Sequence, residues 1–237
     1  MIITVFDYGA GNLHSLAKAL AVTGHAVRIE PDPLAALDTD VLVLPGVGAF
    51  ASAASRLAPG RLAMRRAIDG GLPCLGICLG MQLLFDSSAE GPGEGLGVIA
   101  GRVTRLDAPC VPHIGWNTIE LPERAVDPLL GSAPLEYVYY AHSYACRPAE
   151  AAVTLAWSRH HDDRFAAVVR HGSAFGVQFH PEKSSRPGVR FLQAFLAAAR
   201  NARDLGTPFA TCADIDFSGA DNTADYRLSG PGAMPCS

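Results

Sequence analysis

The first half of the chain alternates short apolar runs with longer segments in which apolar residues recur every three or four positions. The short runs predict strands buried on both faces, and the periodic segments predict amphipathic helices. The expected strands are 2–7, 26–30, 41–44 and 73–77, and the expected helices are 13–22, about 56–68 and 79–85. This order predicts an α/β domain whose mostly parallel sheet is covered by helices on both faces.

The second half differs because its apolar runs follow one another without intervening helices until a closing helix at 189–200. Such a strand-rich pattern predicts antiparallel pairs and therefore a mixed sheet. The candidate strands are 98–106, 117–121, 137–144, 153–157, 166–170 and 175–179. The last segment is rich in Gly, Pro, Ser, Thr and Asp, which predicts one domain at 1–203 and an irregular or disordered tail at 204–237.

Charge and composition narrow the function classes. The 237 residues carry 19 Lys and Arg against 23 Asp and Glu, a net charge of -4, and no basic stripe suits a run of phosphates, so nucleic acid is not an expected partner. The first residues lack a basic leader and the apolar runs are too short to span a membrane, which predicts a soluble, cytoplasmic protein. The six cysteines have neither zinc-site spacing nor the density of a disulfide scaffold, so no metal is expected.

Two glycine-rich turns partly match the patterns of nucleotide-binding sites. Gly9 and Gly11 follow a strand as in a dinucleotide fingerprint, but the third glycine is replaced by His14. The turn "PGVGAF" at 45–50 lacks the Lys-Ser/Thr pair of a phosphate loop. No nicotinamide, flavin or other cofactor is therefore expected, although the backbone N–H groups of 45–50 can still face a shared cleft.

The segment "LPCLGICLGMQLLF" at 72–85 carries the first candidate for chemistry. Cys78 stands between two glycines where a strand meets a helix, which is the cysteine version of the G-x-S-x-G turn. This corner places the thiol at the positive end of a helix and aims the Leu79 N–H at a developing oxyanion. A lone cysteine in an apolar run is as readily a packing residue, so the motif alone leaves both interpretations open; Cys74, on the strand, is assigned to packing.

A base for such a thiol is found in "FGVQFHPEKS" at 175–184. A thiol of ordinary pKa, about 8.5, is mostly protonated at neutral pH and needs a base beside it. The strand ends at His180, and Glu182 follows two residues later on the same side of an extended chain, where one carboxylate can orient one imidazole. An isolated His-Pro-Glu more often ends a strand with its carboxylate in water, but beside a Cys78 corner the catalytic interpretation is favoured.

The segments "GICLGMQ" at 76–82 and "GVQFHPE" at 176–182 resemble the two signatures of the class I glutamine amidotransferases. The resemblance implies a three-layer, flavodoxin-like α/β fold and a glutaminase that releases ammonia through a thioester. It also implies the roles of the following residues: a triad of Cys78, His180 and Glu182; oxyanion donors at Leu79 and, after a local peptide rearrangement, Val47; and glutamine contacts from Gly46, Gly48, Gln82, His142, Ser143 and Tyr144.

A finer resemblance, covering about residues 1–200, concerns the partner. The segments "DYGAGNLHS", "PHIGWN", "YYAHSY" and "HPEKS" are similar to those of family members that pass ammonia to a separate cyclase subunit, an eight-fold β/α barrel, within a heterodimer. By this resemblance the residues at or near the partner are Asn12, Trp116, Tyr139 and Lys183. For Trp116, ordinary core packing is the alternative.

Two other functions remain open at this point. Another class I amidotransferase or a γ-glutamyl hydrolase would share the triad, but it has no reason to carry "DYGAGN" and "PHIGWN". A non-catalytic amidotransferase-like scaffold has no need of an intact Cys78, His180 and Glu182. Release of glutamate in the presence of a cyclase would decide against the scaffold.

Overall fold

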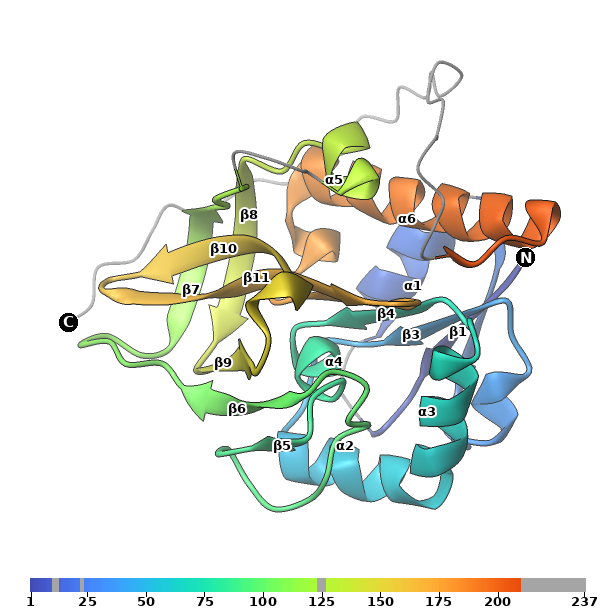
Figure 1. Ribbon diagram of the computed structural model, residues 1–237, viewed down its shortest axis with the longest axis horizontal. Coiled ribbons are helices and arrows are strands. Elements are labelled where there is room, and N and C mark those ends of the chain that lie inside the picture. The colour runs from blue at the N-terminus through green and yellow to red at the C-terminus, as the bar shows by residue number, and fades with distance from the viewer. Residues whose placement is uncertain (10–12, 22–23, 123–126, 210–237) are drawn as a thin grey trace.

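A seven-stranded mixed sheet forms the centre of the computed structural model, which describes residues 1–9, 13–21, 24–122 and 127–209 (Figure 1). The strand order is β10-β11-β12-β4-β3-β1-β2. Five neighbouring strands pair in parallel: β12 (Ala174–Val177), β4 (Cys74–Ile77), β3 (Val41–Leu44), β1 (Ile2–Phe6) and β2 (Ala26–Glu30). The other edge is antiparallel and consists of β11 (Asp163–His171) and β10 (Thr154–His160).

Helices cover both faces of this sheet, which gives the predicted three layers (Figure 1). One layer contains α1 (His14–Ala21), α5 (Pro128–Ser132) and α6 (Ser185–Leu205), and the other contains α2 (Phe50–Leu57) and α3 (Arg61–Asp69). The side chains of β3 alternate between the two apolar clusters: Val41 and Val43 pack with α6, whereas Leu42 and Leu44 pack with α2 and α3. A strand buried on both faces needs the continuous apolar run that predicted it.

The second half adds two small antiparallel units. In the first, β6 (Gly101–Arg105) pairs with β9 (Tyr144–Pro148) and with the short β5 (Ser87–Ser88), the latter in parallel. In the second, β7 (His113–Thr118) pairs with β8 (Tyr137–His142). The expected mixture of a parallel core and antiparallel strands is confirmed.

Several element limits differ from the prediction. The helix expected near 56–68 is two helices, α2 and α3, separated by a turn at Ala58–Gly60 that contains a proline. The helix expected at 79–85 is shorter, because α4 covers only Leu79–Gln82. The strand expected at 137–144 is two strands interrupted at Ser143, since β8 pairs with β7 while β9 pairs with β6.

The C-terminal helix continues past the expected domain limit at residue 203. It ends at Leu205, and Gly206 follows with a positive φ of 63°, the left-handed conformation that commonly stops a helix. Phe209 is then buried against Phe195, and its carbonyl oxygen accepts a hydrogen bond of 2.8 Å from Arg170. The chain is thus packed up to residue 209, and the remainder of the predicted tail, 210–237, lies outside the described residues.

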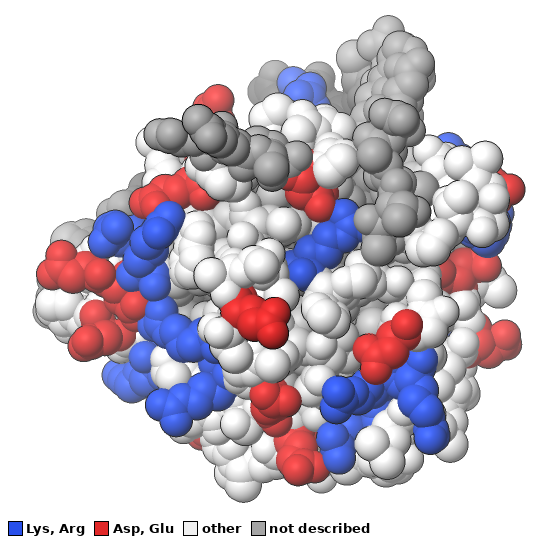
Figure 2. All heavy atoms as spheres, in the orientation of Figure 1, with Lys and Arg blue, Asp and Glu red and all other residues white. Residues whose placement is uncertain are grey.

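The surface carries both signs of charge. On the face seen in Figure 2, basic and acidic side chains are interspersed. Several charged side chains of the protein are paired, as in the 2.6 Å contact of Arg147 with Asp163. Within the described part of the chain, no helix combines the length and apolar character needed to cross a membrane.

Candidate active site

Cys78 occupies a sharp corner between β4 and α4. Its φ of 49° and ψ of -105° are rare for a residue with a side chain, and such strain is tolerated only where the surroundings enforce it. A Cβ on Gly76 would lie 2.6 Å from the Gly80 carbonyl oxygen, and one on Gly80 would lie 1.9 Å from the Leu44 carbonyl oxygen. Only glycine fits at either side of the cysteine, so the corner predicted from the motif is present.

The sheet brings His180 to this corner from a hundred residues away. Strand β12 pairs in parallel with β4, with Val177 opposite Ile77, so the residues after both strands meet at one edge. His180 donates from Nδ1 to Glu182 Oε1 at 2.8 Å, and both side chains are nearly buried. A Cβ on Gly46 would come within 2.8 Å of His180 Cε1 and 3.1 Å of Cys78 Cβ.

The charge state of His180 follows from these neighbours. Burial by itself lowers the pKa of His180, but the charge and hydrogen bond of Cys78, together with Glu182, outweigh burial and raise the pKa to about 10. The imidazole is therefore protonated at neutral pH beside the sulfur. An imidazolium next to a cysteine favours the thiolate, which is the nucleophilic form.

The loop after β3 approaches the same corner. At its start the Tyr8 hydroxyl donates to the Pro45 carbonyl, and at its end the Phe50 N–H donates to Glu90 at 3.0 Å. Between these anchors Gly48 has a positive φ of 115°, and Val47 packs partly buried against the core. The loop is fixed at both ends and has a glycine where its backbone can rotate.

Two of the residues expected to bind glutamine share a third, Tyr144, as their hydrogen-bond acceptor. The Tyr144 carbonyl oxygen accepts from Gln82 Nε2 at 3.0 Å and from His142 Nδ1 at 2.9 Å. Gln82 and His142 are both buried. Ser143 lies between β8 and β9, and its carbonyl oxygen accepts from the Leu106 N–H at 2.9 Å.

The residues expected near a partner gather on the outer face of the β7–β8 pair. Trp116 lies opposite Tyr139, with ring centroids 6.1 Å apart, and Lys183 Nζ lies 6.0 Å from the Tyr139 ring. The side chain of Trp116 is 43% exposed, so it is not a core residue. Asn12, the fourth residue of this set, lies outside the described residues.

Two buried polar residues that contact members of the predicted site were not singled out from the sequence. Gln178 donates from Nε2 to Cys78 Sγ at 3.5 Å, and His113 Nδ1 lies 3.0 Å from His142 Nε2. A signal for Gln178 was available, since a glutamine in the apolar run "FGVQF" needs a buried partner. For His113 there was none, because its partner is set by the register of β7 and β8.

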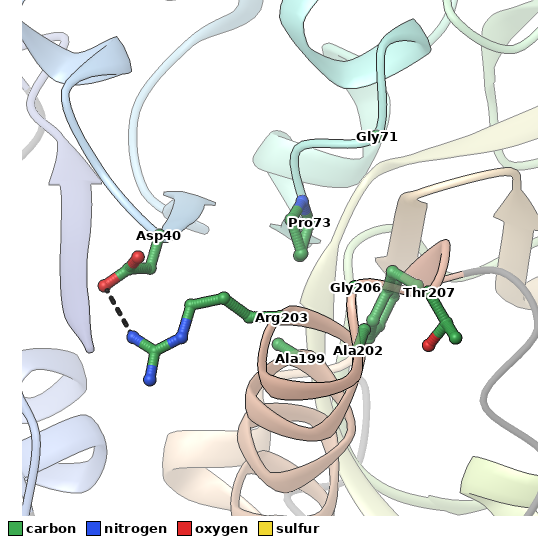
Figure 3. A pocket seen from close by; sticks show the side chains of 9 residues that line it. Asp40, Gly71, Pro73, Ala199, Ala202, Arg203, Gly206 and Thr207 are labelled. Atoms are coloured by element: carbon green, nitrogen blue, oxygen red, sulfur yellow. Dashed lines mark hydrogen bonds and ion pairs between the residues drawn. The ribbon is translucent and has the colours of Figure 1, made fainter.

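A cavity of about 240 Å³ lies at the opposite end of the parallel strands (Figure 3). It is lined by Asp40, Gly71, Pro73, Ala199, Ala202, Arg203, Gly206, Thr207 and Phe209. Asp40 and Pro73 precede β3 and β4, whereas Cys78 follows β4. Ligands of open α/β sheets bind at the carboxyl ends of the strands, so the site is placed at Cys78 and not at this cavity.

A cysteine on a strand-to-helix corner, with a His–Glu pair beside it at the carboxyl edge of a three-layer α/β sheet, is the arrangement of a cysteine-dependent amidohydrolase. Residues 4–199 match the glutamine amidotransferase class-I family, and the chain belongs to that family.

Curated relatives that the chain matches include proteins named imidazole glycerol phosphate synthase subunit HisH. The protein from Thermosynechococcus vestitus is 39% identical over 204 residues, which cover 84% of this chain and 98% of the relative. The protein from Symbiobacterium thermophilum is 45% identical over 195 residues, which cover 80% and 91%.

Solved structures support the fold alone. A glutamine amidotransferase, 19% identical, has a TM-score of 0.65 over 82% of this chain and 99% of that chain. PurLQS from Thermotoga maritima, 20% identical, has a TM-score of 0.61 over 82% and 97%. The α/β amidotransferase fold predicted from the sequence is confirmed.

Proposed function

We propose that this chain is the glutaminase subunit of an imidazole glycerol phosphate synthase of histidine biosynthesis. It hydrolyses glutamine to glutamate and ammonia, and the ammonia passes to a separate cyclase subunit. The observation that carries the proposal is the hydrogen-bonded pair of His180 and Glu182 beside Cys78 on its strained corner. The relatives of known name, which the chain matches over most of its length, support the choice among amidotransferases.

In the first half-reaction the Cys78 thiolate attacks the side-chain amide carbon of glutamine. The tetrahedral intermediate collapses with cleavage of the C–N bond, and the His180 imidazolium gives its proton to the departing nitrogen. The products are ammonia and a γ-glutamyl thioester on Cys78. Glu182 holds the imidazole by its Nδ1–H, which leaves the other ring nitrogen for this transfer.

Water resolves the thioester in the second half-reaction. The now neutral His180 takes a proton from the water as its oxygen attacks the thioester carbon, and the C–S bond breaks. Glutamate leaves, and the thiolate and imidazolium are restored. The same imidazole thus serves both steps, as the acid in the first and as the base in the second.

The two amide donors of the oxyanion hole differ in whether a conformational change is needed before they can donate. Leu79 begins α4 directly after Cys78, so its N–H has no acceptor within the helix. Val47 lies in the anchored loop and supplies the second N–H only after its peptide rotates. One such donor is worth about 3 to 4 kcal/mol of transition-state stabilisation, so this rotation can switch turnover by orders of magnitude.

The outer face of the β7–β8 pair is the surface on which the cyclase docks in this proposal. Ile114, Trp116 and Tyr137 are 62%, 43% and 57% exposed and lie on adjacent strands, a concentration of apolar surface typical of an interface. The site is close behind it, because the His180 N–H donates to the Tyr139 carbonyl oxygen at 2.9 Å.

The test compares two nitrogen sources. A barrel-type cyclase subunit is given its phosphoribulosyl-formimino nucleotide substrate with either glutamine or an ammonium salt, and imidazole glycerol phosphate and aminoimidazole carboxamide ribotide are measured. We expect glutamine to support synthesis only when this chain is present, and ammonium to support it regardless. With Cys78→Ala only ammonium should work. Failure of the wild-type chain to confer use of glutamine on any such cyclase contradicts the proposal.

A further inference from the structure

Gln178 is fully buried at the end of β12, two residues before His180. Its side-chain amide lies against the nucleophile, with Nε2 3.5 Å from Cys78 Sγ. A buried amide carries a large desolvation cost unless both ends find partners. The hydrogen-bond partners of Gln178 therefore determine whether its NH₂ group or its oxygen faces the sulfur.

A backbone carbonyl sets the orientation of this amide. Gln82 must direct its NH₂ group at the Tyr144 carbonyl oxygen, 3.0 Å away, because that oxygen can only accept. The same NH₂ group lies 3.5 Å from Gln178 Oε1, to which it donates. Since the oxygen of Gln178 faces Gln82, its NH₂ group faces Cys78.

A histidine pair holds the Tyr144 carbonyl from its other side. His142 donates to it from Nδ1 at 2.9 Å, so Nε2 of the neutral ring accepts from His113 Nδ1 at 3.0 Å. Both rings are uncharged, because burial, the largest cause, lowers the pKa of His142 to about 4 and that of His113 to about 3. Asn117 in turn donates to His113 Nε2 at 3.2 Å. In this series of hydrogen bonds, each donor or acceptor role is determined by the neighbouring group.

We propose that Gln178 is a further catalytic residue of the chain, whose amide N–H donates to the Cys78 sulfur and stabilises the thiolate. Gln82, whose NH₂ group is fixed by the Tyr144 carbonyl oxygen, keeps that N–H aimed at the sulfur. The thioester sulfur carries no negative charge. The hydrogen bond therefore stabilises the sulfur before attack and again when the thiolate is released. The inference rests on the proposed glutaminase function.

Other groups near the sulfur titrate and must be held constant in a test. His180, backed by Glu182, follows β12; Tyr8 follows β1; Cys146 lies on β9. A substitution at Gln178 leaves the identity of all three residues unchanged. A change in sulfur reactivity in a Gln178 variant is therefore assigned to the amide.

The first test needs no glutamine. The rate of alkylation of Cys78 by iodoacetamide is measured in the full chain, and fragmentation mass spectrometry separates this modification from that of Cys74. The rate at pH 7 is divided by the rate at pH 9, so that differences in the accessibility of the thiol cancel. Gln178→Met, of similar volume but without a donor, should lower this ratio about threefold to tenfold. Gln178→Glu, which keeps the acceptor for Gln82 but places a like charge by the sulfur, should lower it further.

Thr4→Val is the matched control, because Thr4 is a fully buried polar residue on β1 outside this chain of hydrogen bonds. Its ratio should equal that of the wild type. An unchanged ratio in folded Gln178→Met overturns the proposal. If that variant does not fold, Gln178→Glu decides in the same way, and an unchanged ratio there overturns it too.

The second test uses the complex with the cyclase. Gln178→Met should lower the glutaminase kcat about tenfold with KM within about twofold, since the amide contacts the sulfur and not the substrate's amino-acid end. His113, a positioning residue, should show the opposite split: His113→Phe raises KM about fivefold, and His113→Asn, which restores a donor to His142, brings it back. A kcat unaffected by Gln178→Met contradicts the inference, whereas an inactive wild-type complex contradicts the proposed function instead.

Discussion

The corner around Cys78 and the β7–β8 pair are built on opposite principles. At the corner every position is dictated by contact: glycine alone fits at 76 and 80, and the cysteine between them is only 5% exposed. On the outer face of β7 and β8, Ile114, Trp116 and Tyr137 contact water. The residues proposed for the chemistry therefore all belong to this chain, while their proposed control lies on a surface that a partner has to cover.

The largest effect is expected at the corner. Cys78→Ala should reduce glutamate release by at least about ten-thousandfold, since the thiol forms the covalent bond. Binding to the cyclase, measured by titration calorimetry, should change little, because Cys78 is buried and not part of the exposed outer face of β7 and β8. Substantial glutamate production by this variant would falsify the choice of nucleophile.

Gly80→Ala tests whether the corner is sterically enforced. Its new methyl would overlap the Leu44 carbonyl, so the free energy of unfolding in urea should fall by about 3 kcal/mol or more. Gly131→Ala is the matched control: no atom lies within 4 Å of a Cβ there, in helix α5, and stability should rise by about 0.5 to 1 kcal/mol. Equal stability of the two variants would remove the steric argument.

Trp116→Ala should give the reverse result, with little loss of stability but weaker binding of the cyclase. An aromatic anchor at the centre of an interface contributes about 2 kcal/mol, or roughly thirtyfold in Kd. Leu62→Ala on α3 is the control, since Leu62 is also exposed, at 58%, but lies on another face of the sheet. If both variants bind the cyclase as the wild type does, the outer face of β7 and β8 is not the interface.

Glu182→Gln tests the ionic character of the His180–Glu182 pair through the pH dependence of stability. His180 has its pKa raised to about 10 in the folded protein against about 6.5 unfolded, so its contribution to stability is full below about pH 6.5 and is lost as pH rises through 10. Removing the carboxylate should lower the free energy of unfolding by about 1 to 2 kcal/mol at pH 6 and by much less above pH 10. A loss that is independent of pH would show that the pair is not ionic.

The smallest effect is expected at Cys74. It lies on β4, fully buried, and burial raises its pKa far above the ordinary range, so it stays a protonated packing residue. Cys74→Ala should retain most of the stimulated glutaminase rate and lose about 1 kcal/mol of stability, because only a small cavity is left. Loss of turnover in a folded Cys74→Ala protein would mean that the two cysteines were assigned wrongly.

The corner was predictable because its information is local. Two glycines, a cysteine and a strand-to-helix change lie within five residues, and His180 and Glu182 are two apart. The helix limit after Gln82 was not predictable, since the apolar spacing of Leu83 to Phe85 serves a packed turn as well as a helix. Nor was the break at Ser143, where no proline or glycine marks the change of partner strand.

The contacts of Gln178 with Cys78 and of His113 with His142 could not be predicted for another reason. Gln178 and Cys78 are 100 residues apart, and they meet only through the pairing of β12 with β4. His113 and His142 meet only in one register of β7 and β8. A shift of one residue would turn either side chain to the opposite face, and nothing in a single sequence fixes that register.

The most direct test of this account measures glutamate release by the full chain alone, with a cyclase subunit, and with that subunit and its nucleotide substrate together. The isolated chain should be nearly silent, because in the proposed mechanism the Val47 amide becomes an oxyanion donor only in the complex with nucleotide. The subunit and nucleotide together should raise kcat at least about a hundredfold, the value of one completed donor. A full rate from the isolated chain, unchanged by subunit or nucleotide, would contradict the account and indicate an independent hydrolase.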